Sequence, residues 1–78
     1  VALFVLDPGA SLAEHATSGI VTVQAIEGDL DVTAGGVDYP LRAGMLVVMA
    51  PGVRHDVRAK SRAVFLLQVS LAPKPQNP

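Results

Sequence analysis

The chain contains no cysteine and no tryptophan, and its aromatic side chains are limited to one tyrosine and two phenylalanines. Without cysteine, the protein can form neither disulfide bonds nor thiolate zinc sites. So few aromatic rings give no platform on which nucleic-acid bases could stack. Six Lys and Arg against seven Asp and Glu leave a formal net charge of -1, so there is no electrostatic reason to bind nucleic acid or an anionic membrane.

The sequence also lacks the ~20-residue apolar run of a membrane-spanning helix. We therefore expect no nucleic-acid partner, no membrane partner and a cytoplasmic location. Seventy-eight residues, half of them hydrophobic, are enough for one small domain. Because a chain this short buries only about 60% of its unfolded surface, self-association would add stability, and we expect a homodimer.

Turn residues divide the chain at regular intervals and predict an all-β fold. Glycine, proline and polar residues recur about every 8–12 residues, which is typical of a β-sandwich or β-barrel. Ser11–His15 is the one stretch where a single helical turn is plausible. We expect a domain over residues 1–72, followed by a flexible, proline-rich tail over residues 73–78. The expected strands are Val1–Leu6, Ile20–Ile26, Leu30–Thr33, Val37–Leu41, Met45–Met49, His55–Ala59 and Ala63–Leu71.

Residue types predict where some of these strands lie in a sheet. The pair Gly35-Gly36 suits a tight hairpin turn. Pro40 cannot donate a hydrogen bond to a neighbouring strand, which places the Val37–Leu41 strand at a sheet edge or at a bulge. The Met45–Met49 strand is apolar throughout, so we expect it to be covered on both faces. The apolar Val1–Leu6 strand needs a partner, either in its own sheet or across a dimer interface.

The strand that follows Pro51 alternates between two faces. His55 shares one face with Val57 and Ala59. The other face carries Arg54, Asp56, Arg58, Lys60 and Arg62. Two interpretations of this second face stay open, a basic stripe for an anionic partner and a solvated outer surface, and the near-neutral total charge favours the second.

Two glycine-framed motifs carry a resemblance to a known family. The motifs are G-x5-H-x-H-x3,4-E-x6-G and G-x5-P-x-G-x2-H-x3-N. Their glycines and two of their histidines are matched from Gly9 through His15 to Gly28 and from Gly44 through Gly52 to His55, whereas Ala50 and Ala59 stand at the proline and asparagine positions of the second motif. The sequence therefore resembles the cupin family over nearly its whole length, which implies a small all-β jelly-roll barrel or sandwich.

The resemblance also implies a metal site with half of its ligands replaced. Cupins hold a divalent metal, commonly iron, manganese, nickel or zinc, through three histidines and a glutamate. The metal-ligand roles carry over to His15 and His55, whereas Thr17 and Val21 occupy the other two ligand positions. Two imidazoles with water can hold copper, nickel or zinc, but only loosely.

Other roles for the two histidines stay open. His15 could accept a hydrogen bond from a turn amide, His55 could be a polar residue that covers the pocket, and either could act as a general base. Glu14 and Asp56 do not replace the missing carboxylate, because neighbours on a strand face opposite ways. Tyr39 and Phe65 are expected to fill the core or an interface. The expected cavity wall is apolar, as in a small-molecule site or a filled barrel, and comprises Val21, Val23, Leu46 or Val47, Met49 and Val57.

Three functions follow from these observations. The first, favoured by the loss of half the ligand set, is a small single-domain cupin that binds a small molecule, with or without a loosely held divalent ion (Zn, Ni, Cu, Fe or Mn). The second is a metal-dependent enzyme of the dioxygenase or isomerase type, in which His15 and His55 act with a third, unidentified ligand. The third is a structural or regulatory module that works through its dimer interface and the outer basic stripe.

Overall fold

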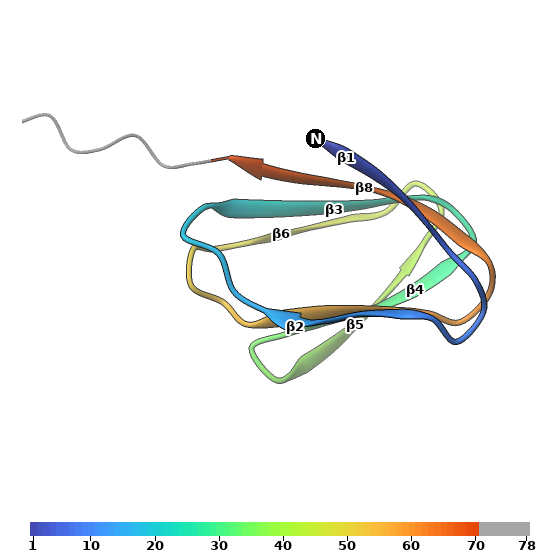
Figure 1. The fold of residues 1–78 in the computed structure, drawn as a ribbon, viewed down its shortest axis with the longest axis horizontal. Coiled ribbons are helices and arrows are strands. Elements are labelled where there is room, and N and C mark those ends of the chain that lie inside the picture. The colour runs from blue at the N-terminus through green and yellow to red at the C-terminus, as the bar shows by residue number, and fades with distance from the viewer. Residues whose placement is uncertain (71–78) are drawn as a thin grey trace, which may run out of the picture.

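Within residues 1–70, the chain forms eight strands in two antiparallel sheets (Figure 1). The structure is a computed structural model, and it describes these residues apart from the side chain of His15. No helical segment in this range has the length and hydropathy that crossing a membrane requires. The strands are β1 (Ala2–Leu6), β2 (Ser11–His15), β3 (Ile20–Glu27), β4 (Asp29–Ala34), β5 (Val37–Arg42), β6 (Leu46–Met49), β7 (His55–Ala59) and β8 (Ala63–Ser70).

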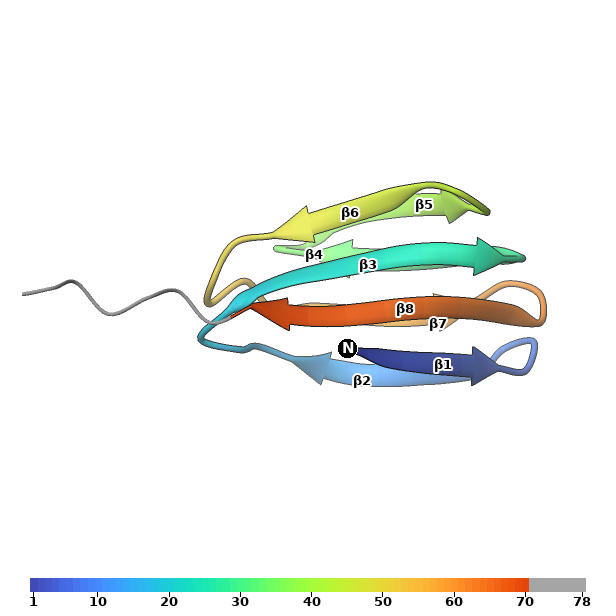
Figure 2. The same ribbon diagram turned by 90° about the horizontal axis from the view of Figure 1, so that it is seen from above.

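The strand order is that of a jelly roll. One sheet has the order β1-β8-β3-β6, and the other has the order β2-β7-β4-β5. The chain passes from one sheet to the other after every strand except β4, which forms a hairpin with β5. Figure 2 shows β1, β8, β3 and β6 lying over β2, β7, β4 and β5. The predicted all-β jelly-roll fold is confirmed.

The hydrophobic core lies between the two sheets. Alternate residues of β3 and β4 are buried, as expected for strands with one face against a core. Phe65 of β8 is the largest fully buried side chain, and its ring stacks on Phe4 of β1 with a centroid separation of 5.2 Å and an interplanar angle of 13°. The prediction that Phe65 fills the core is therefore confirmed.

Two predictions about strand position are confirmed. β5, which contains Pro40, is the last strand of its sheet, so the proline does not interrupt a central ladder. Gly35 and Gly36 have φ angles of 58° and 80° and connect β4 to β5, as a two-residue hairpin turn requires. Of the two alternatives for the first strand, the structure has β1 paired with β8 in its own sheet.

Two other predictions are wrong. Ser11–His15 is strand β2 rather than a helical turn, because it pairs with β7. The Met45–Met49 run is not covered on both faces, since β6 is an edge strand whose Leu46 and Val48 are 53% and 58% exposed. An apolar run favours a strand covered on both faces, but this one lies at the edge of a sheet whose outer face is apolar and exposed. The predicted tail, 73–78, and the last two residues of the predicted domain lie outside the described residues.

Candidate functional site

A cavity of about 430 Å³ opens between β5 and β6, the last strands of the two sheets. The end of the β4–β5 hairpin forms one wall, and β6 with the loop that follows it forms the other. The lining residues are Ala34, Gly35, Val37, Tyr39, Val47, Val48, Met49, Ala50 and Val53.

The cavity wall matches the sequence prediction only in part. Val47 and Met49 line the cavity as expected. Val21, Val23 and Val57 do not line it, because they are packed in the core with at most 2% of their surface exposed. Tyr39 does not fill the core, since this side chain is 42% exposed and forms part of the cavity wall. The other predicted role of Tyr39, at an interface, stays a prediction.

His55 is not part of the cavity wall but lies next to two residues that are. It begins β7 and is 1% exposed, which makes it the one buried polar or charged side chain among the residues that the structure describes. Its neighbour Ala34, directly opposite in the β4–β7 register, lines the cavity, and so does Val53. The Nδ1 atom of His55 lies 3.0 Å from the carbonyl oxygen of Val53. Because a carbonyl can only accept, Nδ1 donates this hydrogen bond.

The backbone of His15 lies opposite His55 because of a β-bulge. The β2–β7 register pairs Leu12 with Val57 and then His15 with His55, so β2 has one residue more than β7 between these pairs. With regular alternation Glu14 would lie opposite His55 instead. Residues directly opposite each other in an antiparallel pair have Cβ atoms about 4.5–5.5 Å apart. The structure thus brings together the backbone positions of the two predicted metal ligands, and their metal binding remains a prediction.

The other two ligand positions of the cupin motif provide no ligand here. Val21 is a core residue without a donor atom, and Thr17 Oγ1 donates a hydrogen bond to the carbonyl oxygen of Gly19 at 3.2 Å. No group of three or more His, Asp or Glu side chains that could hold a metal occurs among the described residues. Glu14 forms an ion pair with Arg54. The residues present therefore do not fit a complete cupin metal centre.

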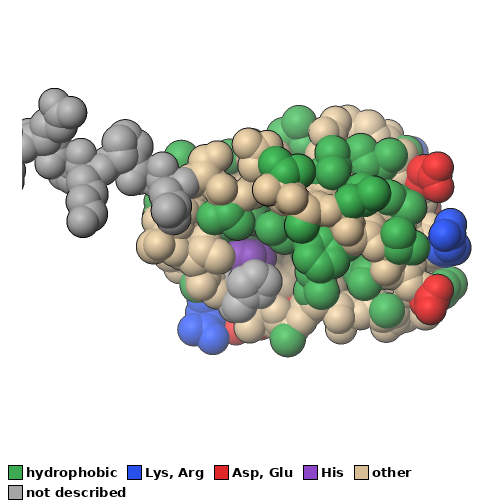
Figure 3. Space-filling view, turned by 45° about the horizontal axis from the view of Figure 1, so that its top comes forward, with side chains coloured by type: hydrophobic (Ala, Val, Ile, Leu, Met, Phe, Trp, Pro, Cys, Tyr) green, Lys and Arg blue, Asp and Glu red, His purple; other side chains and the backbone are tan. Residues whose placement is uncertain are grey.

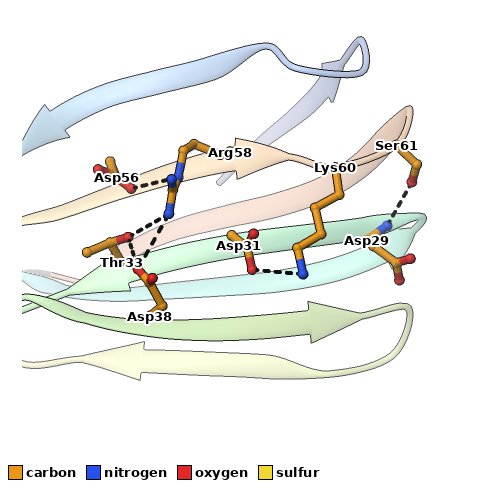
Figure 4. A network of polar contacts seen from close by, with 8 residues as sticks. All are labelled: Asp29, Asp31, Thr33, Asp38, Asp56, Arg58, Lys60 and Ser61. Atoms are coloured by element: carbon orange, nitrogen blue, oxygen red, sulfur yellow. Dashed lines mark hydrogen bonds and ion pairs between the residues drawn. The ribbon is translucent and has the colours of Figure 1, made fainter.

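The outer face of the β2-β7-β4-β5 sheet is an array of ion pairs (Figure 4). Arg58 donates to Asp38 at 3.4 Å and to Thr33 at 3.2 Å, and Lys60 lies 3.2 Å from Asp31. Three cations of the supposed basic stripe, Arg54, Arg58 and Lys60, are thus paired with carboxylates. This pairing supports the interpretation of the stripe as a solvated outer face.

The eight strands form a β-barrel of jelly-roll type with an apolar cavity between the last strands of its two sheets. The model of the cupin domain family matches residues 2–69, and the chain belongs to that family.

Solved structures with the same fold include a protein of unknown function and a predicted enzyme. A conserved Streptococcus pyogenes protein of unknown function is 27% identical, with a TM-score of 0.87 over 91% of this chain and 62% of that one. The protein TT1209 from Thermus thermophilus is 31% identical, with a TM-score of 0.81 over 91% of this chain and 70% of that one. A predicted oxalate decarboxylase from Thermotoga maritima is 23% identical, with a TM-score of 0.82 over 90% and 64% of the two chains, and shares the fold.

The chain is shorter than these relatives. It spans less than two thirds of the Streptococcus pyogenes and Thermotoga maritima proteins. The comparison with curated proteins gave no match.

Proposed function

We propose that this cupin binds a small, largely apolar molecule in the cavity between β5 and β6, with His55 as the polar group at the inner end. The observation that carries this proposal is the position of a buried histidine next to an apolar cavity of about 430 Å³. Small-molecule sites are usually cavities of about 300–1,000 Å³ lined by apolar side chains with a few polar groups.

The lining favours a neutral ligand. None of the residues that form the cavity wall carries a charge, and Tyr39 provides the one side-chain hydroxyl. An ionised ligand buried here would lose its hydration without gaining a counter-charge, which is strongly unfavourable. The imidazole of His55 is held by Val53, so it can orient a ligand at fixed geometry. The expected ligand is an uncharged apolar molecule with one hydroxyl or carbonyl group.

We further propose that His15 and His55 form a weak two-imidazole site for copper, nickel or zinc. The opposed backbone positions support this, and so does the bond from His55 Nδ1 to a backbone carbonyl. Histidines that bind metals through one nitrogen commonly donate from the other nitrogen to a carbonyl or carboxylate. A dioxygenase or isomerase would need a further ligand, and neither Thr17 nor Val21 offers one. A loosely held, exchangeable ion is therefore favoured over a catalytic centre.

The ligand proposal can be tested by NMR titration of the isotope-labelled chain with phenol, indole and benzyl alcohol, and with benzoate as a charged counterpart. We expect the neutral compounds to shift the amide signals of Val37, Tyr39, Val47 and Met49, and benzoate to bind at least about tenfold more weakly. Shifts spread over the outer faces of the sheets, or stronger binding of benzoate, would contradict the proposal.

A matched pair of variants locates the site. Val37 and Val5 are both exposed strand valines, at 51% and 53%, but only Val37 lines the cavity. Val37→Trp should fill the opening and weaken binding of the neutral compounds at least about tenfold, since the indole ring occupies ligand volume. Val5→Trp should leave their affinity unchanged. Equal effects of the two substitutions would show that the compounds bind elsewhere.

A further inference from the structure

The cavity between β5 and β6 is bordered by a free strand edge from each sheet. Among the strands of residues 1–70, β5 is bonded only to β4, and β6 is bonded only to β3. Figure 2 shows β5 and β6 at the same side of the molecule. A free edge carries backbone N–H and C=O groups that have no partner in the ladder. The borders of this cavity therefore offer backbone polar groups in addition to apolar side chains.

The hydrogen bonds of β4 show which backbone groups of β5 face the free edge. The N–H of Lys60, next to β7, donates to the carbonyl oxygen of Asp29 at 3.1 Å. Every second residue of β4, counted from Asp29, therefore faces β7, and the others face β5. Asp38 and Pro40 lie opposite residues of β4 that face β7, so their own backbone groups point to the free edge of β5.

The same reasoning gives the free edge of β6. The N–H of Ala25 in β3 donates to the carbonyl oxygen of Met45 at 2.9 Å. Counted from Met45, alternate residues face β3, so the backbone groups of Leu46 and Val48 point away from it. Val48 lines the cavity although its side chain belongs to the outer face of the sheet, which is hydrophobic (Figure 3). Val48 therefore borders the cavity with its backbone.

The two edges differ in their balance of donors and acceptors. Pro40 has no N–H, so the β5 edge has two carbonyl groups, those of Asp38 and Pro40, but only the N–H of Asp38. The β6 edge has both the N–H and the C=O of Val48. No backbone hydrogen bond outside the strand ladders involves Asp38 or Val48 within residues 1–70. A ligand between the edges therefore finds its acceptor mainly on β5 and its donor on β6.

We propose that the ligand of this cavity is a neutral, largely apolar molecule with a secondary amide group. Its N–H donates to the carbonyl oxygen of Asp38, and its C=O accepts from the N–H of Val48. This inference rests on the proposed function, because it specifies the ligand class of the same cavity. Twice the strand spacing of about 4.8 Å is close to the ~10 Å between packed sheets, so one amide group can bond both edges.

Desolvation explains why an amide is preferred to other neutral ligands. A molecule that fills the cavity excludes water from both edges. A ligand without an N–H leaves the carbonyl group of Asp38 without a donor, and one without an acceptor leaves the N–H of Val48 unpaired. Each unmade bond costs affinity, because the buried group has lost its hydration. A secondary amide satisfies both edges with a single uncharged group.

Three matched compounds test the proposal on the unmodified 78-residue chain. N-benzylacetamide is a secondary amide, whereas N-benzyl-N-methylacetamide and benzyl acetate keep the carbonyl but lack the N–H. In an NMR titration, we expect N-benzylacetamide to bind at least about tenfold more tightly than the other two and to shift the amide signals of Asp38 and Val48. Equal affinity of the three compounds would overturn the proposal.

A pair of proline variants tests the bond to Val48. Val48 and Leu46 both have an N–H on the free edge of β6 and side chains that are 58% and 53% exposed, but only Val48 lines the cavity. Proline is tolerated where the N–H is outside the ladder. Val48→Pro should weaken binding of N-benzylacetamide at least about tenfold and leave that of indole, which has no acceptor, unchanged. Leu46→Pro should change neither. Full affinity for N-benzylacetamide in Val48→Pro would overturn the proposal.

The titrations separate a failure of this inference from a failure of the proposed function. If phenol, indole and benzyl alcohol shift the signals of the cavity residues but the three matched compounds bind alike, the cavity is a ligand site and the amide preference is wrong. If no neutral compound shifts those signals, the ligand site itself is wrong, and the amide preference is overturned with it. Both outcomes are measured on the unmodified chain, so neither depends on the folding of a variant.

Discussion

Glu14 and Arg54 form an ion pair beside the β2 bulge, with 2.9 Å between Oε1 of Glu14 and Nε of Arg54. Glu14 lies inside the bulge, and Arg54 directly precedes His55. The carboxylate that regular alternation would place opposite His55 is thus held by a cation at the protein surface. The bulge then brings the next residue, His15, opposite His55.

We predict that this ion pair contributes little to stability. Both side chains are at least half exposed, and exposed ion pairs are typically worth about 1 kcal/mol or less. A double-mutant cycle measures the coupling energy between the two side chains. It compares urea unfolding of the parent with that of Glu14→Gln, Arg54→Gln and the double variant. A coupling well above about 1 kcal/mol would mean that the pair, rather than strand pairing, holds the bulge in place.

A second prediction concerns the hydrogen bond from His55 to Val53. His55→Ala should lower the free energy of unfolding by about 2–3 kcal/mol, because it leaves a cavity and removes the donor to the partly buried carbonyl of Val53. His55→Asn places an amide nitrogen near the position of Nδ1, so its cost should be about 1 kcal/mol smaller. Urea unfolding of both variants checks this order, and equal costs would show that the bond does not stabilise the fold.

The same asparagine variant tests the two-imidazole site. Asparagine replaces Nδ1 but has no atom at the place of Nε2, so His55→Asn should lose binding of added nickel while remaining folded. His15→Ala should lose it as well, because one imidazole alone is a weak ligand. Calorimetric titration with nickel chloride measures the effect. If either variant binds nickel like the parent, the two histidines do not form a joint site.

The general fold could be predicted from local sequence signals. Pro40 and the Gly35-Gly36 pair each constrain the backbone by themselves, so an edge strand and a hairpin follow without tertiary information. The exposure of β6 could not be predicted in this way. Leu46 and Val48 have the residue types of a buried strand, and their exposure depends on which strands lie next to them.

The candidate site was harder to predict than the fold. The bulge in β2 reverses the alternation of a five-residue strand, and the sequence Ser11–His15 contains no glycine or proline to indicate it. Tyr39 shows a similar limit. Tyr39 lies in the cavity wall because β5 and β6, the last strands of two different sheets, lie opposite each other. This arrangement depends on tertiary structure and not on the local sequence.

We also predict that the fold does not depend on a bound metal. Twelve buried hydrophobic residues form one core cluster, and a three-ligand site is absent among the described side chains. Dialysis against EDTA should therefore leave the thermal midpoint unchanged within about 2 °C, and the purified protein should contain well under one metal ion per chain. Stoichiometric iron or manganese, with a large drop in midpoint on chelation, would show that a further ligand completes the site.

The last prediction concerns Gly28, the glycine that ends the first cupin motif. Its φ angle is 77°, and a Cβ atom added there would lie too close to the carbonyl oxygen of Arg62. Gly36 has a similar φ angle of 80° but open space around it. Gly36→Ala should therefore cost about 1 kcal/mol for the backbone conformation alone.

Gly28→Ala should cost at least about 2 kcal/mol more than Gly36→Ala, because the β3–β4 turn must also move away from the backbone before β8. For a domain of this size, whose total stability is about 4–12 kcal/mol, such a loss is measurable by urea unfolding and large enough to lower the yield of folded protein. If both substitutions lower the free energy of unfolding by the same amount, the close approach of Gly28 to Arg62 does not contribute to stability. Glycine would then be required at position 28 only because of its positive φ angle.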